Sequence, residues 1–331
     1  MVGNRLFWID WAKTIGIFLV ILGHVPVLLN VKWAIYGIHM PLFFIISGYL
    51  KSSISGKEGR GKALKKILNG LLIPYLIYCT AITLLYVALK GGSTIVPNIL
   101  MANYSELVGD YTSICPLWFL VSLITIKVID LFMENTPPQL PYKCLIFMAF
   151  AIVISYIQMP NYFMLKTTIL CLPFYYIGIY IKEKSFLVED GAMSRIPLWI
   201  LIMGFISSFV FSYINGTVYL TTCDVGRSYI LFLMSSIIGC ICLFGILQRL
   251  TRKSFSLIEK ISEGTLLIMS LHYLLIKPLV SFIPSDGFCG WMVDSMIILG
   301  ITTLLVCVSK KYCPVLIGKK IIINDKYKLY E

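Results

Sequence analysis

Three ionisable side chains occur in a stretch that is otherwise apolar enough to cross a membrane. The segment IDWAKTIGIFLVILGHVP (9–26) carries Asp10, Lys13 and His24. Such groups are rare inside spanning helices and usually functional, because each must be buried in protein or face water. At about 100° and 1.5 Å per helical residue, all three are expected on one face, along a stripe about 20 Å long. A structural alternative also stands, in which Lys13 pairs with Asp10 and His24 hydrogen-bonds to a neighbouring carbonyl group.

The other two of the three histidines also fall in predicted spans. His39 lies in YGIHMPLFFIISGYL (36–50), and His272 lies in GTLLIMSLHYLLIKPL (264–279). A short connection joins the first two spans, so we expect His24 and His39 to converge at similar depth on adjacent antiparallel helices. A histidine at that depth can act as a general base on an acceptor hydroxyl, which favours group transfer.

The stretch around His39 also contains residues that shape a helix. Pro41 lacks a backbone donor and is expected to bend or start the second span. Ser47 and Gly48 form a small pair that lets another helix, or a ligand, approach closely. These residues therefore predict a tightly packed second span.

The whole composition indicates a membrane protein. Of 331 residues, 58% are hydrophobic and 13% are charged, whereas a soluble domain carries about a quarter charged residues. We predict an all-α polytopic protein with about ten transmembrane helices, because apolar runs of spanning length recur along the chain. The expected spans are roughly 7–29, 32–50, 65–89, 115–133, 142–158, 164–181, 196–214, 228–248, 264–283 and 291–309. We expect one membrane-embedded domain over 1–331, with no appended soluble domain.

Basic residues set the expected orientation. They are concentrated in alternate connections, which predicts that both the N- and C-termini are cytoplasmic. The net charge of +12 has a simple explanation in topology and in attraction to anionic lipid head groups. The alternative is that Lys62, Lys65 and Lys66 of GKALKK (61–66) hold a phosphorylated ligand. We expect no metal, because the cysteines are scattered without convergent ligands, and no nucleic-acid partner.

Two motifs in the first half of the chain resemble motifs of a known family. DWAKTIGIFLVILGHV (10–25) followed by IHMPLFFIISGYL (38–50) resembles the integral-membrane acyltransferases that O-acylate sugars and cell-envelope polysaccharides, especially the fucose O-acetylase-like branch. The resemblance covers nearly all of the chain, including LWFLVSL (117–123) and GTLLIMSLH (264–272). It implies transfer of an acyl group, usually acetyl from acetyl-CoA, onto a carbohydrate hydroxyl.

The resemblance also implies roles for particular residues. Members carry a basic residue and an essential histidine in the first span, which here correspond to Lys13 and His24. A basic pair after the second span, thought to hold the CoA phosphates, corresponds to Lys62 and Lys65, with Lys66 beside them. Arginine is common at these positions in the family. Lysine keeps the charge but lacks the planar fork of arginine.

These roles combine into an expected mechanism. His24 deprotonates the sugar hydroxyl, which attacks the thioester, while the donor arm extends beside the stripe of Asp10 and Lys13. His39, or a backbone amide near Pro41, stabilises the oxyanion, an interaction often contributing about 3 kcal/mol.

Three further residues are predicted to contact the acceptor. Trp118 is expected to stack on a sugar, although packing and interfacial anchoring explain most aromatic residues. Arg227 in CDVGRSY (223–229) is expected either to bind the acceptor or to pair with Asp224. His272 is also predicted to contact the acceptor.

Other classes of protein would also need intramembrane charge. The main alternative is a transporter or flippase of a lipid-linked sugar or small solute, and a non-catalytic scaffold is a more distant one. For the acyltransferase, we expect a carbohydrate acceptor (exopolysaccharide, O-antigen or lipid-linked sugar), contact with membrane lipid, and a bacterial cytoplasmic membrane.

Overall fold

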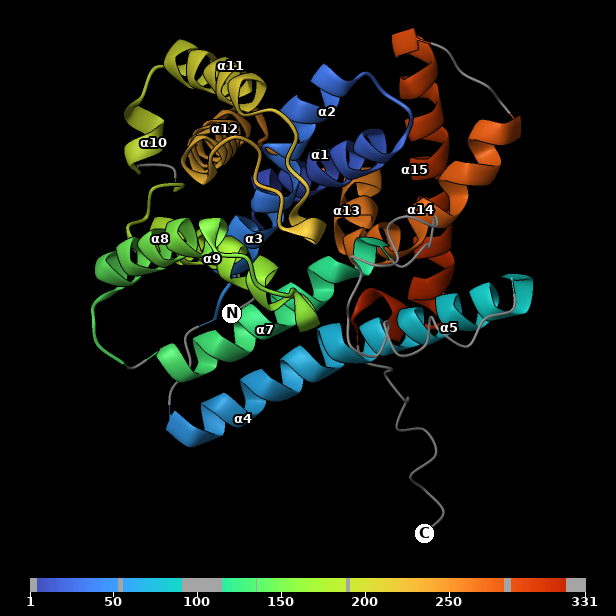
Figure 1. The fold of residues 1–331 in the computed structure, drawn as a ribbon, viewed down its shortest axis with the longest axis horizontal. Helices are drawn as coiled ribbons and strands as arrows, with labels where there is room; N and C mark the ends of the chain where they lie inside the picture. Colours follow the sequence, from blue (N-terminus) through green and yellow to red (C-terminus); the bar gives the residue numbers. More distant parts are fainter. Residues whose placement is uncertain are drawn as a thin grey trace.

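The computed structural model describes residues 5–52, 56–90, 115–134, 136–188, 191–282 and 287–319, and this part is built of helices (Figure 1). The first half contains α1 (Phe7–His24), α2 (Leu29–Tyr36), α3 (His39–Tyr49), α4 (Gly56–Ile67), α5 (Ile73–Lys90), α7 (Trp118–Met133) and α8 (Leu140–Tyr156). The second half contains α9 (Leu165–Glu183), α10 (Ala192–Arg195), α11 (Leu198–Asn215), α12 (Tyr229–Leu250), α13 (Ser256–Glu263), α14 (Thr265–Phe282) and α15 (Gly287–Tyr312). The all-α prediction is confirmed for these residues.

Many of these helices can cross a membrane. Seven helical stretches in the described part are long and apolar enough to do so. They are Phe7–His24, Leu29–Tyr49, Glu58–Leu85, Tyr162–Glu183, Leu198–Asn215, Tyr229–Leu250 and Gly287–Tyr312. The shorter apolar helices Leu140–Tyr156 and Thr265–Ile276 coincide with two more predicted spans. Helix α7 coincides with the remaining predicted span, 115–133. The chain is thus an integral membrane protein, and its orientation stays a prediction.

The N-terminal helices form the centre of the bundle (Figure 1). α1 contacts α3, α12, α13, α14 and α15, whereas α3 packs along α9. α11 pairs with α12, and α14 pairs with α15. α4 and α5 continue one another, through a π-helical turn at Leu68–Leu72, as a long rod beside α7. The centrally placed α1 and α3 carry two of the three histidines.

The second predicted span is interrupted at the point where His39 lies. α2 ends at Tyr36, and α3 begins at His39 with Pro41 in its first turn, where proline is tolerated. The expectation that Pro41 starts a helix is therefore confirmed. The interruption frees backbone carbonyl groups within the bundle, and α12 satisfies one of them, because the Ser236 hydroxyl donates to the Gly37 oxygen at 2.6 Å. Such irregular backbone is tolerated at membrane depth where protein surrounds it.

Two glycines let α3 and α9 pack with their backbones in contact. A Cβ atom added to Gly48 would lie 1.9 Å from the carbonyl oxygen of Tyr175, and one added to Gly178 would lie 2.0 Å from that of Ile45. Small residues at a helix crossing allow this approach, which stabilises membrane bundles through close packing. The prediction of close approach at Gly48 is confirmed.

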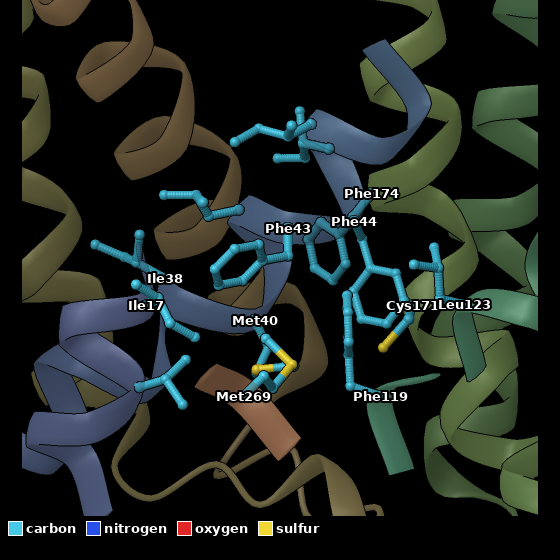
Figure 2. Close-up of a cluster of buried hydrophobic side chains, with 14 of the residues drawn as sticks. Ile17, Ile38, Met40, Phe43, Phe44, Phe119, Leu123, Cys171, Phe174 and Met269 are labelled. Atoms are coloured by element: carbon cyan, nitrogen blue, oxygen red, sulfur yellow. The ribbon is translucent and has the colours of Figure 1, made fainter. Parts of the chain in front are cut away.

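A group of aromatic side chains fills the interior beside α3 (Figure 2). Phe44 and Phe119 have ring centroids 4.9 Å apart, and those of Phe43 and Phe119 are 6.0 Å apart. All three side chains are buried. We call these three side chains the aromatic partition.

Candidate functional site

A cavity of about 240 Å³ brings together three residues that the sequence selected. His24 from the end of α1, His39 from the start of α3 and Trp118 from the start of α7 all line it. Residues 218–222, in the connection between α11 and α12, form another part of its wall. The predicted convergence of His24 and His39 is therefore confirmed. We call this space the histidine cavity.

Hydrogen bonds to the backbone fix the protonation pattern of two histidines. His39 Nδ1 lies 2.9 Å from the carbonyl oxygen of Ile35, and His272 Nδ1 lies 3.0 Å from that of Ile268. A carbonyl oxygen only accepts, so each Nδ1 must carry the proton. In the neutral rings each Nε2 therefore keeps its lone pair.

His24 is surrounded by rings. Its centroid lies 5.2 Å from that of Tyr273, 5.3 Å from that of His272 and 6.3 Å from that of Tyr36. Tyr36 donates its hydroxyl proton to the carbonyl oxygen of Gly23 at 2.9 Å, which ties α2 to the end of α1. Within the described part of the chain, the imidazole of His24 is held by these rings and forms no hydrogen bond. A sugar hydroxyl entering the cavity would therefore find it available.

His272 lies behind His24 instead of on the cavity wall. Its side chain is fully buried, and it is absent from the residues that line the histidine cavity. A direct contact between His272 and an acceptor, as the sequence suggested, would need the cavity to change shape.

A second, larger cavity of about 790 Å³ carries the lysines after α3. Lys62, Lys65 and Lys66 line it from α4, and Lys51 and Lys127 line it from the other side. We call this space the lysine cavity. It is large enough, and positive enough, for a phosphorylated ligand.

The lysines of this cavity differ in their partners. Lys51 Nζ lies 2.8 Å from the buried carboxylate of Asp130, which also accepts a hydrogen bond from the Tyr175 hydroxyl at 3.2 Å. Lys62 forms an exposed ion pair with Glu58 at 2.5 Å. Lys127 Nζ lies 5.5 Å from the centroid of the Tyr175 ring and forms no ion pair with any described carboxylate. The charge of Lys127 is thus available to an anionic ligand.

The two cavities lie toward opposite ends of the same helices. On α3, His39 and Met40 line the histidine cavity, whereas Ser47 lines the lysine cavity. These positions are separated by eight residues, about 12 Å along a helix. On α7, Trp118 and Lys127 are placed in the same way. Phe43 and Phe44 lie between these positions on α3, and Phe119 lies between them on α7, so the aromatic partition occupies the helix segments between the two cavities.

Asp10 and Lys13 belong to a different part of the molecule. The carboxylate of Asp10 accepts hydrogen bonds from Arg5 Nε and from the Ser262 hydroxyl, both at 2.6 Å. Lys13 forms no ion pair with Asp10 among the described residues, and neither residue lines the histidine or the lysine cavity. Lys13 precedes His24 by eleven residues, about 16 Å along the helix. The expected stripe therefore exists along α1, but its two ends face different surroundings.

Arg227 also lies outside the histidine cavity. Its side chain is exposed, and its backbone N–H donates to the Asn215 oxygen at 2.9 Å. No ion pair joins it to Asp224 within the described residues. The structure thus separates Arg227 from His24 and His39, whereas it joins Trp118 to them.

Sequence reasoning missed several residues at these cavities. Tyr36 and Tyr273 enclose His24, yet neither stands out among the 20 tyrosines of the chain. Lys127 and Asp130 carried a usable signal, because both are charged and lie within the predicted span 115–133. Intramembrane charges of this kind are functional candidates by default.

Comparison with known proteins shows which family this architecture represents. A family model described as "Acyltransferase domain" matches residues 6–310. Nodulation protein NolL of Mesorhizobium japonicum is 33% identical over 144 residues, which cover 39% of this chain and 37% of that protein. Nodulation protein NolL of Sinorhizobium fredii is 35% identical over 132 residues, which cover 37% of this chain and 34% of that protein.

These similarities differ in extent. The chain matches little more than a third of the length of either NolL protein, and no solved structure is significantly similar to it. The family model, by contrast, includes both cavities almost completely, from α1 to α15. The chain therefore belongs to the acyltransferase domain family of integral membrane proteins.

Proposed function

We propose that this protein is a membrane-bound O-acyltransferase that moves an acetyl group from acetyl-CoA to a hydroxyl of a carbohydrate. One observation carries the proposal: the lysine cavity and the histidine cavity lie toward opposite ends of α3 and α7, with the aromatic partition on the helix segments between them. One cavity suits phosphates and the other suits proton transfer. An acyl-CoA has phosphates at one end and a thioester at the other, joined by a long flexible arm.

The lysine cavity would hold the phosphates of the donor. Lys62, Lys65 and Lys66 supply charge from α4, and Lys127 supplies it from α7. Hydrogen bonds between charged partners are about twice as strong as neutral ones. Lys51 is less available, because Asp130 already neutralises it.

The thioester would then meet the acceptor beside His24. The imidazole of His24 takes the proton from the sugar hydroxyl as its oxygen attacks the thioester carbonyl carbon. The carbon–sulfur bond breaks, and the proton passes from His24 to the departing thiolate. Such proton transfer typically contributes 10²–10⁴-fold in rate.

The hydrogen bond from His39 Nδ1 to the Ile35 oxygen limits which roles His39 can have in the reaction. Its neutral Nε2 accepts hydrogen bonds, so it suits a sugar hydroxyl better than an oxyanion. The first-turn N–H groups of α3 have no intrahelical partner, and they belong to residues at the cavity wall, His39 and Met40. We assign oxyanion stabilisation to this helix start and acceptor binding to His39 and Trp118.

Asp10 and Lys13 receive an anchoring role in this proposal. The contacts of Asp10 with Arg5 and with Ser262 of α13 hold the start of α1, and both Asp10 and Lys13 lie away from the two cavities. We place the lysine cavity on the cytoplasmic side, with both termini, in agreement with the distribution of basic residues. A bacterial cytoplasmic membrane supplies both cytoplasmic acetyl-CoA and a carbohydrate acceptor at the surface.

Acetyl transfer in membranes tests the proposal. Membranes with the wild-type protein, given acetyl-CoA labelled in the acetyl group, should transfer label to a carbohydrate fraction and release free CoA in equal amount. A transporter or flippase would move its substrate without consuming the thioester, so absence of CoA release would contradict the proposal.

A further inference from the structure

A second histidine lies directly behind the proposed base, with one nitrogen unused. His272 is fully buried, and its Nδ1–H donates to the carbonyl oxygen of Ile268 at 3.0 Å. Its Nε2 is buried and forms no hydrogen bond with any described residue. A buried polar atom without a partner costs about 1–3 kcal/mol, so its presence asks for an explanation.

His24 is the polar ring best placed to use that nitrogen. The two ring centroids lie 5.3 Å apart, with the ring planes inclined by 45°. His24 lines the histidine cavity and His272 does not, so the pair runs from the cavity into the interior of the bundle. Neighbouring groups have other partners: the Tyr36 hydroxyl is bound to Gly23, and Nδ1 of His39 is bound to Ile35.

We infer that His272 is a positioning residue for His24: its buried Nε2 accepts a hydrogen bond from one ring N–H of His24. This inference rests on the proposed function of His24. A rotation of the His24 ring would form the bond, since centroids 5.3 Å apart allow one nitrogen of each ring to come within hydrogen-bond distance of the other. The second nitrogen of His24 then keeps its lone pair and faces the cavity, where the acceptor hydroxyl arrives.

The arrangement has the logic of a base that is oriented by a third group. When His24 takes the proton from the hydroxyl, it becomes an imidazolium with two N–H groups. One N–H remains bonded to Nε2 of His272, and the other returns its proton to the thiolate that leaves. His272 gains and loses no proton in the cycle, so it acts through His24 alone.

A structural role for His272 makes a different prediction. A histidine kept only for packing would be replaced without loss of activity by leucine, which has a similar volume and no unpaired acceptor. Replacing an unsatisfied polar group by an apolar group of similar shape is nearly neutral or stabilising. A purely structural His272 therefore predicts that His272→Leu leaves transfer per folded molecule unchanged.

Two substitutions separate these roles. In His272→Gln the side-chain oxygen can occupy the place of Nε2 and accept the same hydrogen bond, whereas His272→Leu offers no acceptor. We expect His272→Leu to lower kcat about 10- to 100-fold, a part of the roughly 10²–10⁴-fold that a general base contributes, with the KM for acetyl-CoA unchanged and the Tm not lowered. His272→Gln should retain most of the wild-type kcat. If the leucine variant does not fold, His272→Asn replaces it, because its shorter amide cannot reach the position of Nε2.

A readout that does not depend on acyl transfer completes the experiment. Diethyl pyrocarbonate modifies an imidazole through its lone pair, and mass spectrometry gives the rate for each histidine of the purified protein. We expect His272→Leu to slow modification of His24 and His272→Gln to preserve it. His39, held independently by Ile35, is the internal control and should be modified equally in all three proteins.

Acetyl transfer and labelling of His24 test the proposed function and the positioning of His24 independently. If wild-type protein transfers no acetyl group but His24 labelling still follows the variants as expected, the proposed function fails and the positioning of His24 stands. If His24 is labelled equally in the wild type and in both variants, or if His272→Leu keeps the wild-type kcat, the inference is overturned.

Discussion

The histidine cavity and the lysine cavity hold their reactive groups in opposite ways. At the first, a hydrogen bond to Ile35 fixes the orientation of His39, rings enclose His24, and behind them a hydrogen bond to Ile268 fixes His272. In the second, Lys62, Lys65 and Lys66 are exposed side chains on α4. The chain thus places its imidazoles inside the bundle and leaves most of its cavity lysines free to move.

This difference follows from what each cavity is proposed to do. Forming one bond requires reacting atoms held in a near-attack geometry, and small misplacements are costly. Phosphates are held by charge, and lysine is a flexible point charge that adapts to them. A site for chemistry therefore needs fixed neighbours, whereas a site for phosphates needs positive charge near its entrance.

Removing the imidazole of His24 is expected to have the largest effect. His24→Ala should abolish acetyl transfer, a loss of at least about 10²-fold for a general base, while expression stays normal. The measurement is label transferred per folded molecule in purified membranes. Gly300→Ala, whose added Cβ meets no atom within 4 Å, is the control and should retain transfer. Wild-type product from His24→Ala would contradict the assignment of the base.

Damage to the packing between α3 and α9 should affect both cavities together. Gly178→Ala places a Cβ atom 2.0 Å from the Ile45 oxygen, and overpacking of this kind typically costs about 1–3 kcal/mol. We expect a lower Tm in detergent, followed by loss of transfer. Gly300→Ala is the control, because its added Cβ meets no atom within 4 Å. Equal Tm values for the two variants would show that the close crossing does not stabilise the fold.

Removing one charge from the lysine cavity should change donor affinity and leave the chemistry intact. Lys127→Met is expected to raise the KM for acetyl-CoA about tenfold, which corresponds to 1.4 kcal/mol, with kcat nearly unchanged. Lys62→Met should have a smaller effect, because Lys62 is exposed and paired with Glu58. Steady-state kinetics at two salt concentrations measure both, since added salt should reduce the difference. A fall in kcat alone would place Lys127 in the chemistry instead.

A substitution at Lys13 distinguishes an anchoring role of this residue from a role in donor binding. Because Lys13 lines neither cavity, we expect Lys13→Ala to leave the KM for acetyl-CoA unchanged. A clear rise in that KM would show that the donor reaches the start of α1, as in the mechanism expected from the sequence.

The smallest expected effect concerns the ion pairs of Glu263 with Lys310 and Lys319, near the start of α1. Burial raises the pKa of the Glu263 carboxyl, but hydrogen bonds from Lys319 and Lys310 outweigh it and lower that pKa to about 2. The folded pKa is below the unfolded value, so the stabilisation is complete above about pH 4.3 and is lost as the pH falls toward 2. Lowering the pH from about 5 to about 3 should therefore lower the Tm of the wild type more than that of Glu263→Gln. An equal fall in Tm for the wild type and for Glu263→Gln would contradict this expectation.

The sequence predicted what depends on local pattern. Apolar runs located the helices, Pro41 located the start of α3, and the short connection brought His24 and His39 together. It could not show which way each helix turns about its axis. His272 is buried although its neighbour Tyr273 lines the histidine cavity, Arg5 instead of Lys13 pairs with Asp10, and Lys127 lines the lysine cavity. These outcomes depend on contacts between helices that are distant in the chain.

In the proposed function, one donor molecule spans both cavities. The most direct measurement is a cryo-electron microscopy structure of the protein with a non-hydrolysable acetyl-CoA analogue. We expect phosphate density beside Lys65, Lys66 and Lys127, and the carbonyl carbon of the analogue past Phe119 and beside His24. Density with both ends of the analogue on the same side of the aromatic partition would contradict it.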